Sequence, residues 1–286
     1  MKIDCERIAN AMLEEAKEGI ALLKQRGITP TLGIIRVGSD PASETYVRNK
    51  VKTCSELGIR CITFSLPEDI TQEELEKHIN MMHDFRSHMG VEFTTDGIIL
   101  QLPLPAHLDA EKAIMHIWPV EDVDGLSPNS STIPCTPLGI MNILDREDIE
   151  LEGKHAVIVG RSKLVGKPLA KLLLERNCTV TVCHSKTENL SLHTRSADIL
   201  ISAVGKPGLI QAYMIKPDAV VIDVGINRVD GKLVGDVDPF AMEFNPDAQF
   251  TPVPGGVGKT TVAALACNLV QLAMRRHGID KAGDDA

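Results

Sequence analysis

Apolar residues along the chain fall into two stretches in which short apolar runs alternate with segments of helical periodicity. The first stretch opens with apolar residues three or four positions apart, a spacing that predicts an amphipathic helix over about residues 5–26. Gly58 is expected to end a second helix, and the capping pattern T71-Q-E-E74 to start a third. Apolar runs typical of buried strands lie at 31–37, 59–64 and 96–101.

The second stretch begins near residue 150 and repeats the alternation. A helix is expected from Val165 to Arg176, and a last apolar helix from about Thr260 to Arg276. Because strands separated by helices pair in parallel, the pattern predicts an α/β fold with doubly wound parallel sheets. A segment rich in proline and serine, 128–137, is expected to connect the two halves. The strands of this second half are expected at 155–160, 178–183, 197–202 and 218–224.

Composition narrows the classes of function. A length of 286 residues fits one large or two ordinary domains. The net charge of -9 argues against a general nucleic-acid binder, although local charge can still bind an anionic ligand. No run of about 20 apolar residues predicts a membrane span, and the N-terminus lacks the apolar region of a signal peptide. No nucleic-acid or membrane partner is therefore expected.

Cysteine and histidine spacing gives no sign of a metal. The 7 cysteines are scattered without a C-x-x-C pair, so neither a zinc site nor a disulfide framework is predicted. Reduced thiols in a cytoplasm are the simplest interpretation. His78, His83 and His88 recur at steps of five, which does not align them on one helix face. We expect them to be surface histidines, and we predict no metal site.

Tyr46 and Lys50 are the first candidates for chemistry. Asp40 can cap a helix here, and residues four apart share one helix face, so the phenol and the ammonium are expected side by side. Taken alone, such a pair is more often a half-buried aromatic beside a solvated charge. Gln101 equally fits a residue that simply ends a strand, and Asp124 fits a solvated acidic turn.

The loop G160-R-S-K-L-V-G166 is the candidate nucleotide site. It follows an expected strand and opens an expected helix, where free backbone N–H groups can hold a pyrophosphate. A tight strand-to-helix turn that needs glycine would look the same. The next strand ends C183-H-S-K-T187 without the carboxylate that usually binds the ribose of NAD. NADP is therefore favoured, because a 2'-phosphate could be surrounded by His184, Ser185, Lys186 and, across the turn, Arg161.

Further short motifs accompany these residues in a fixed order. They are Q101-L-P-L104, D122-V-D-G125, Pro134-Cys-Thr-Pro137, G160-R-S-K-L-V-G166, V221-I-D-V-G-I-N227 and T251-P-V-P-G-G-V-G258. Together with Tyr46 and Lys50, this ordered set resembles the bifunctional methylenetetrahydrofolate dehydrogenase/cyclohydrolases. The resemblance extends from about Ile3 to the final helix.

This resemblance implies a domain plan and a reaction. Residues 1–135 would form an N-terminal α/β folate-binding catalytic domain, completed by a C-terminal helix at about 260–278 that packs back on it. Residues 136–259 would form a Rossmann-like NADP-binding domain, with the active site in the cleft between the sheets. The family oxidises 5,10-methylenetetrahydrofolate with NADP and hydrolyses the product to 10-formyltetrahydrofolate. The resemblance also implies that the partners are tetrahydrofolate derivatives and that the protein is a cytoplasmic homodimer. It further implies a place in one-carbon metabolism and purine biosynthesis.

The resemblance also assigns roles to residues. Lys50 would handle protons during water addition, Tyr46 would stack on the folate, and Gln101 would hydrogen-bond Lys50. Asp124 would hold the pterin N–H groups, and Ser43 would complete the surroundings of the lysine. The nucleotide would contact Gly160, Arg161, Ser162, Ser185 and Ile226. The folate pocket would include Pro254, Gly255 and Gly256.

Three features depart from the family pattern. G255-G-V-G-K-T-T261 stands where the family has Pro-Met-Thr after the glycines, Glu6 stands where lysine is common, and the connection over 126–133 is shortened. The first resembles a variant phosphate loop of chromosome-partitioning ATPases. That alternative fails on order, because a phosphate loop needs the rest of a sheet after it and Thr261 is close to the C-terminus. Lys259 is therefore not expected to bind a nucleotide phosphate, and Thr260 is expected to start the final helix.

Two further interpretations remain beside the main one. A dehydrogenase acting on a shikimate-like metabolite would share the two-domain layout, but would not explain Tyr46, Lys50, Gln101 and Asp124 together. A non-catalytic NADP-binding module would explain the glycine-rich loop alone. Loss of activity when Lys50 is replaced would distinguish an enzyme from such a module.

Overall fold

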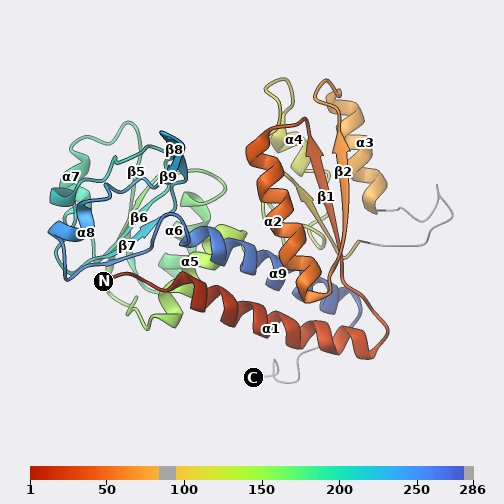
Figure 1. Ribbon diagram of the computed structural model, residues 1–286, viewed down its shortest axis with the longest axis horizontal. Helices are drawn as coiled ribbons and strands as arrows, with labels where there is room; N and C mark the ends of the chain where they lie inside the picture. Colours follow the sequence, from red (N-terminus) through yellow and green to blue (C-terminus); the bar gives the residue numbers. More distant parts are fainter. Residues whose placement is uncertain (84–94, 280–286) are drawn as a thin grey trace. The chain divides into compact units, whose positions relative to one another are not determined.

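The computed structural model describes residues 1–83 and 95–279 and contains two compact units (Figure 1). The three-stranded unit consists of Met12–Cys135 and Leu265–Ala286. The five-stranded unit consists of Met1–Ala11 and Thr136–Ala264. Each unit therefore combines segments from distant parts of the sequence.

The three-stranded unit has a parallel sheet in the order β2-β1-β3. Since the chain steps from β1 to β2 and then back past β1 to β3, right-handed crossovers place α2 and α3 on opposite faces of the sheet (Figure 1). Its elements are β1 (Thr31–Val37), α2 (Pro41–Leu57), β2 (Arg60–Leu66), α3 (Gln72–His83), β3 (Gly97–Leu100) and α4 (Ala110–Ile114), with most of α1 (Cys5–Gln25) and of α9 (Val257–Arg276).

The five-stranded unit has a parallel sheet in the order β10-β7-β6-β4-β5 and a separate antiparallel hairpin, β8-β9. The chain leaves β4 toward β5 and then returns to the other side of β4 for β6, so the direction of winding switches beside β4. Its elements are α5 (Cys135–Arg146), β4 (His155–Val159), α6 (Gly166–Glu175), β5 (Thr179–Cys183), α7 (Leu190–Thr194), β6 (Ile199–Ser202), η1 (Ala212–Met214), β7 (Val220–Asp223), β8 (Asn227–Val229), β9 (Lys232–Val234), α8 (Ala241–Phe244) and β10 (Gln249–Phe250).

Each sheet packs an aliphatic core against its helices. In the three-stranded unit, Ile35 and Val37 of β1 pack with Leu75 and Ile79 of α3. In the five-stranded unit, alternate residues of β4, β6 and β7 pack around Ile210, next to η1. The alternation along each strand is what directs one set of side chains to one face.

Helix α9 differs from expectation at its start and in its composition. It begins at Val257, three positions before the predicted Thr260, so Lys259 lies in its first turn. Among the described residues, α9 is also the one helix long and apolar enough to cross a membrane, a possibility that the sequence pattern had excluded. Two-thirds of that window is buried, 67%, so packing within the fold accounts for its composition.

Candidate active site

Lys50 is buried in the three-stranded unit and contacts two of the predicted site residues. Its residue surface is only 8% exposed. Its Nζ donates a hydrogen bond to Gln101 Oε1 at 3.2 Å and lies 3.9 Å from Asp124 Oδ2. Helix α2 presents the lysine, and Gln101 directly follows β3, so the carboxyl end of a strand faces one side of a helix. The solvated-charge alternative is therefore wrong for Lys50.

Tyr46 and Ser43 lie on the same helix as Lys50. Asp40 caps that helix by accepting a hydrogen bond from Ser43 N at 2.7 Å. Tyr46 is 40% exposed, and partial burial raises the pKa of its phenol, so the ring stays neutral and accessible. Within the described part of the chain, Ser43 Oγ is buried without a hydrogen-bond partner. A buried hydroxyl without a partner is costly unless a ligand supplies one.

The segment 121–125 is not the solvated turn that its carboxylates allow. Glu121 and Asp122 are each only 1% exposed. Asp122 accepts hydrogen bonds from Gly125 N at 2.9 Å and Ser127 N at 2.7 Å, while its burial raises the pKa of the carboxyl. This turn carries Asp124 and holds it beside Lys50.

Cys135 adds a buried thiol to this group that the sequence did not indicate. Its Sγ contacts Val123 O at 3.4 Å. Burial first, and the charge of Asp124 second, hold the pKa of the thiol well above its usual value. Cys135 is therefore a neutral neighbour of Asp124 and not a nucleophile.

The histidine prediction is wrong for one of its three residues. His83 is buried at the end of α3 and contacts Glu121, whereas His78 is half-buried and His88 lies outside the described residues. Among the described residues, no group of three or more metal-ligating side chains is present. Glu121, the partner of His83, lies 38 positions away in the sequence, so no local spacing predicted this contact.

The predicted nucleotide loop lies at the carboxyl end of β4, where the winding of the five-stranded sheet switches. Gly160 has a φ of 126°, and a Cβ there would lie 2.5 Å from Ala203 O. A Cβ on Gly166 would lie 2.2 Å from Gly160 O. Both positions therefore require glycine, because the loop folds closely on itself before α6. Ser162 Oγ accepts a hydrogen bond from Val165 N at 3.1 Å and shapes the turn.

Arg161 and Ser185 follow neighbouring strands. Val159 of β4 pairs with Cys183 of β5, so the residues after both strands leave the same edge of the sheet. Arg161 and Ser185 are both exposed there. The turn after β5 is closed by a hydrogen bond from His184 N to Thr187 Oγ1 at 2.9 Å.

The loop 251–258 approaches Ile226 within the same unit. Thr251 joins the loop to β7, since its Oγ1 accepts a hydrogen bond from Asp223 N at 2.8 Å. A Cβ on Gly256 would lie 2.2 Å from Pro252 O, and a Cβ on Gly258 would lie 3.8 Å from Ile226 Cδ1. Pro254 and Gly255 are exposed, whereas Gly256 is buried. The predicted site residues thus fall into two groups, one in each unit.

Two of the departures from the family pattern contact each other. Lys259 Nζ lies 2.8 Å from Glu6 Oε2. Lys259 stands on the first turn of α9, and in the described residues after it there is helix and no further strand. This arrangement lacks the sheet of a phosphate-loop ATPase.

Comparison with known families assigns both halves of the chain. Residues 3–124 match the catalytic domain of tetrahydrofolate dehydrogenase/cyclohydrolase, and residues 134–277 match its NAD(P)-binding domain. The chain belongs to the tetrahydrofolate dehydrogenase/cyclohydrolase family. The bifunctional protein FolD of Halothermothrix orenii is 46% identical over 97% of this chain and 99% of its own length.

Solved structures of this family confirm the predicted fold class. The bifunctional FolD methylenetetrahydrofolate dehydrogenase/cyclohydrolase of Campylobacter jejuni has a TM-score of 0.90 and 43% identity, covering 96% of this chain and 99% of its own. The Trypanosoma brucei enzyme, solved with NADP cofactor and an inhibitor, has a TM-score of 0.88 and 36% identity, covering 97% and 98%. These comparisons give the ATPase alternative no support.

Proposed function

We propose that this protein oxidises 5,10-methylenetetrahydrofolate with NADP and hydrolyses the resulting methenyl cation to 10-formyltetrahydrofolate. In the first step a hydride leaves the methylene carbon and NADP is reduced. In the second step water adds to the methenyl carbon, a proton is released and the ring opens. The observation that carries the proposal is the buried Lys50 between Gln101 and Asp124, in a chain that belongs to this family.

The surroundings of Lys50 support a role in proton handling. Among the nearby groups, Tyr46 and Cys135 have pKa values raised by burial and stay protonated. Lys50 keeps a defined position because Gln101 and Asp124 hold its amine from two sides. An amine held in this way can assist the attack of water and the movement of its proton. Tyr46, with its exposed ring, would stack on the pterin, and Asp124 would pair with the pterin N–H groups.

The glycine-rich loop after β4 fits a dinucleotide. Its close backbone approach at Gly160 and Gly166 leaves room for a pyrophosphate at the start of α6. When bound, NADP supplies the hydride acceptor. Arg161 and Ser185 would contact its 2'-phosphate from the shared edge of β4 and β5, and Ser162 and Ile226 would complete the site.

We also propose that the protein works as a cytoplasmic homodimer and supplies 10-formyltetrahydrofolate to one-carbon metabolism, including purine biosynthesis. Scattered free cysteines support a reducing compartment. Light scattering of the purified protein measures the mass of the assembly, and a monomer of 31.1 kDa would contradict the dimer.

The proposed function is tested by following both reactions in one spectroscopic assay. Purified protein is mixed with 5,10-methylenetetrahydrofolate and either NADP or NAD, and the absorbance of the reduced nucleotide and of the methenyl product is recorded. We expect reduction with NADP and no lasting accumulation of the methenyl compound. A protein that reduces neither nucleotide would contradict the proposal.

Replacement of Lys50 separates the two activities. Lys50→Met keeps much of the shape and removes the amine, so cyclohydrolase activity should fall by about 100-fold or more, the usual scale for a general acid or base. Hydride transfer depends mainly on alignment and should fall less, so the methenyl compound should accumulate. Lys52→Met, on the same helix but exposed and paired with Glu56, is the matched control. Hydrolysis by Lys50→Met at the unmodified rate would show that Lys50 is not catalytic.

A further inference from the structure

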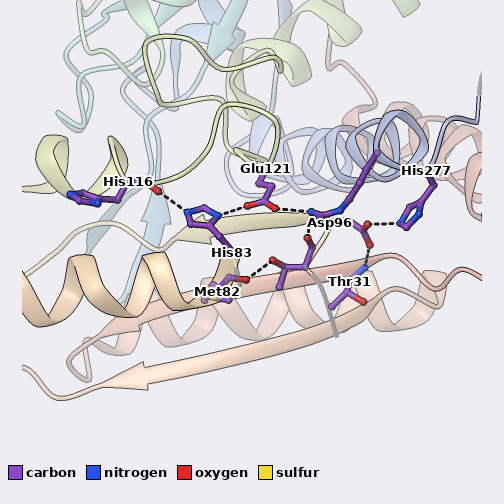
Figure 2. Close-up of polar contacts among 9 residues, drawn as sticks. Thr31, Met82, His83, Asp96, His116, Glu121 and His277 are labelled. Carbon is purple, nitrogen blue, oxygen red and sulfur yellow. Dashed lines mark hydrogen bonds and ion pairs between the residues drawn. The ribbon is translucent and has the colours of Figure 1, made fainter. Parts of the chain in front are cut away.

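His83 has a hydrogen-bond acceptor at each of its ring nitrogens (Figure 2). Its Nε2 donates to His116 O at 2.7 Å, and its Nδ1 contacts Glu121 Oε2. The side chain is 2% exposed, and Trp118 stacks on the ring with centroids 4.5 Å apart. A backbone oxygen only accepts, so Nε2 is the donor of the first contact, and both ring nitrogens are used.

The other carboxyl oxygen of Glu121 has a partner of its own. Oε1 accepts a hydrogen bond from Arg276 Nη1 at 2.6 Å. A guanidinium favours the ionised form of a carboxyl. Glu121 is therefore held at both carboxyl oxygens, by Arg276 at Oε1 and by the ring of His83 at Oε2. We refer to His83, Glu121 and Arg276 as the buried triad.

The buried triad holds the segment that carries Asp124. Glu121 O accepts a hydrogen bond from Ile98 N at 2.7 Å, which places the segment along β3. The next link is Val123, whose carbonyl oxygen accepts a hydrogen bond from Asn268 Nδ2 at 2.9 Å. A Cβ on Gly97 would lie 2.1 Å from Val123 Cγ2, so the glycine lets this side chain pack against the strand. Asp124 follows directly and faces Lys50.

Charge compensation explains why the buried triad matters at this position. Three acidic residues stand within four positions, and each has its own partners: Arg276 and His83 for Glu121, backbone N–H groups for Asp122, and Lys50 for Asp124. A buried carboxylate without a partner would be costly and would repel its neighbours. If Arg276 were absent, Glu121 would shift the segment or compete with Asp124 for positive charge.

We propose that Glu121, fixed by Arg276 and His83, is a positioning residue that holds Asp124 in place for the folate. The inference rests on the proposed function, because Asp124 is the residue that would bind the pterin. It assigns no contact between the triad and the substrate. It concerns substrate affinity, and it predicts that loss of the triad raises the KM for the folate more than it lowers kcat.

The experiment compares neighbouring residues at the end of α9. Arg276→Gln removes the cation from Glu121, whereas His277→Gln removes an adjacent ion pair, to Asp96 at 3.0 Å, that does not touch the segment. We expect Arg276→Gln to raise the KM for the methenyl substrate by about 10-fold and to change kcat by less than about 2-fold. An effect of this size is expected when a group that binds the substrate, here Asp124, is slightly displaced. Arg276→Lys keeps the charge and should restore most of the affinity. His277→Gln should leave the KM unchanged.

The emission of Trp118 gives a readout that does not depend on catalysis. Trp118 is the single tryptophan of the sequence, and it stacks on His83. The emission of an indole depends on the groups in contact with it, so a change of geometry in the triad should change the emission. Arg276→Gln should shift it, and His277→Gln should not.

The outcomes separate this inference from the proposed function. Activity of the unmodified protein in both assays supports the function whatever the variants do. Equal changes of KM in Arg276→Gln and His277→Gln would overturn the positioning role, as would a folded Arg276→Gln with unchanged KM. If Arg276→Gln does not fold, Glu121→Gln, which keeps a side chain of the same size, replaces it with the same expectation. If neither folds, the triad is a requirement for folding and the positioning role is wrong.

Discussion

Burial decides which side chains near Lys50 can exchange protons at neutral pH. The phenol of Tyr46 and the thiol of Cys135 have raised pKa values because burial disfavours their charged forms. The pKa of Asp122 is also raised by burial, and both of its carboxyl oxygens accept hydrogen bonds from backbone N–H groups. The amine of Lys50, in contrast, is held in a fixed position by Gln101 and Asp124.

The preference for NADP is a prediction about one arginine. Arg161 is exposed at the edge of β4 and β5, where a 2'-phosphate would lie, and a hydrogen bond between charged groups contributes roughly 1.5–3 kcal/mol. Arg161→Ala should raise the KM for NADP by about 10-fold or more and change that for NAD little. Steady-state kinetics with both nucleotides measures this. Equal use of NADP and NAD by the unmodified protein would refute the assignment.

Residue contacts were predictable where a local pattern or the family resemblance pointed to them. The hydrogen bond between Lys50 and Gln101 joins residues 51 positions apart, and only the resemblance placed them together. The buried triad was not predictable, because Glu121 lies 155 positions from Arg276 and no periodicity links the two. An acidic residue in a turn with other carboxylates is expected to be solvated until its partners are known.

At the scale of elements, the strands of both parallel sheets with strong apolar runs were predicted, whereas helix α5 and several short elements were missed. Strands β1 and β4 and helix α1 agree with expectation within one residue, since their apolar spacing is strong. The expected strand at 59–64 continues to Leu66, and the connection 128–137 already ends in α5, which begins at Cys135. Helices α4 and α7 and the hairpin β8-β9 are too short for a periodic signal. Their ends are set by caps such as Asp109, which precedes α4.

The start of α9 yields a prediction about Lys259 and Glu6. Their side chains are 42% and 66% exposed, so their ion pair should contribute only about 0–1 kcal/mol to stability. Lys259→Ala should therefore leave both folate activities close to those of the unmodified protein, and neither protein should hydrolyse ATP. Phosphate release with ATP and magnesium measures this. ATP hydrolysis abolished by Lys259→Ala would revive the ATPase alternative.

At the scale of the whole molecule, the pH dependence of stability should reflect Asp223. Burial raises the pKa of this carboxyl to about 6, from an ordinary 3.8, although it accepts hydrogen bonds from three backbone N–H groups. Between these two values the folded protein binds more protons than the unfolded chain, so this group increases the free energy of unfolding as the pH falls from about 7.5 to about 4.5. The gain should be about 2 kcal/mol.

Asp223→Asn isolates this contribution, because it removes the titration and leaves the other carboxyls in place. Urea unfolding of both proteins at about pH 7.5, 6 and 4.5 provides the comparison. The unmodified protein should gain stability relative to Asp223→Asn as the pH falls. Parallel pH profiles would show that Asp223 does not titrate in this range.

The order in which the chain leaves the ribosome has a consequence for how the protein is made. Phe250 of β10 pairs with residues 1–3 through hydrogen bonds from Ile3 N to Phe250 O and from Phe250 N to Met1 O, both 2.8 Å. These residues therefore cannot reach their final position before β10 has been synthesised. The three-stranded unit in turn lacks Arg276, the counter-charge of buried Glu121, until α9 is complete. Domains usually fold as units, the N-terminal one first, during synthesis. Here neither unit is complete until α9 has been synthesised, so a nascent chain that stalls before Arg276 would hold buried Glu121 without this partner.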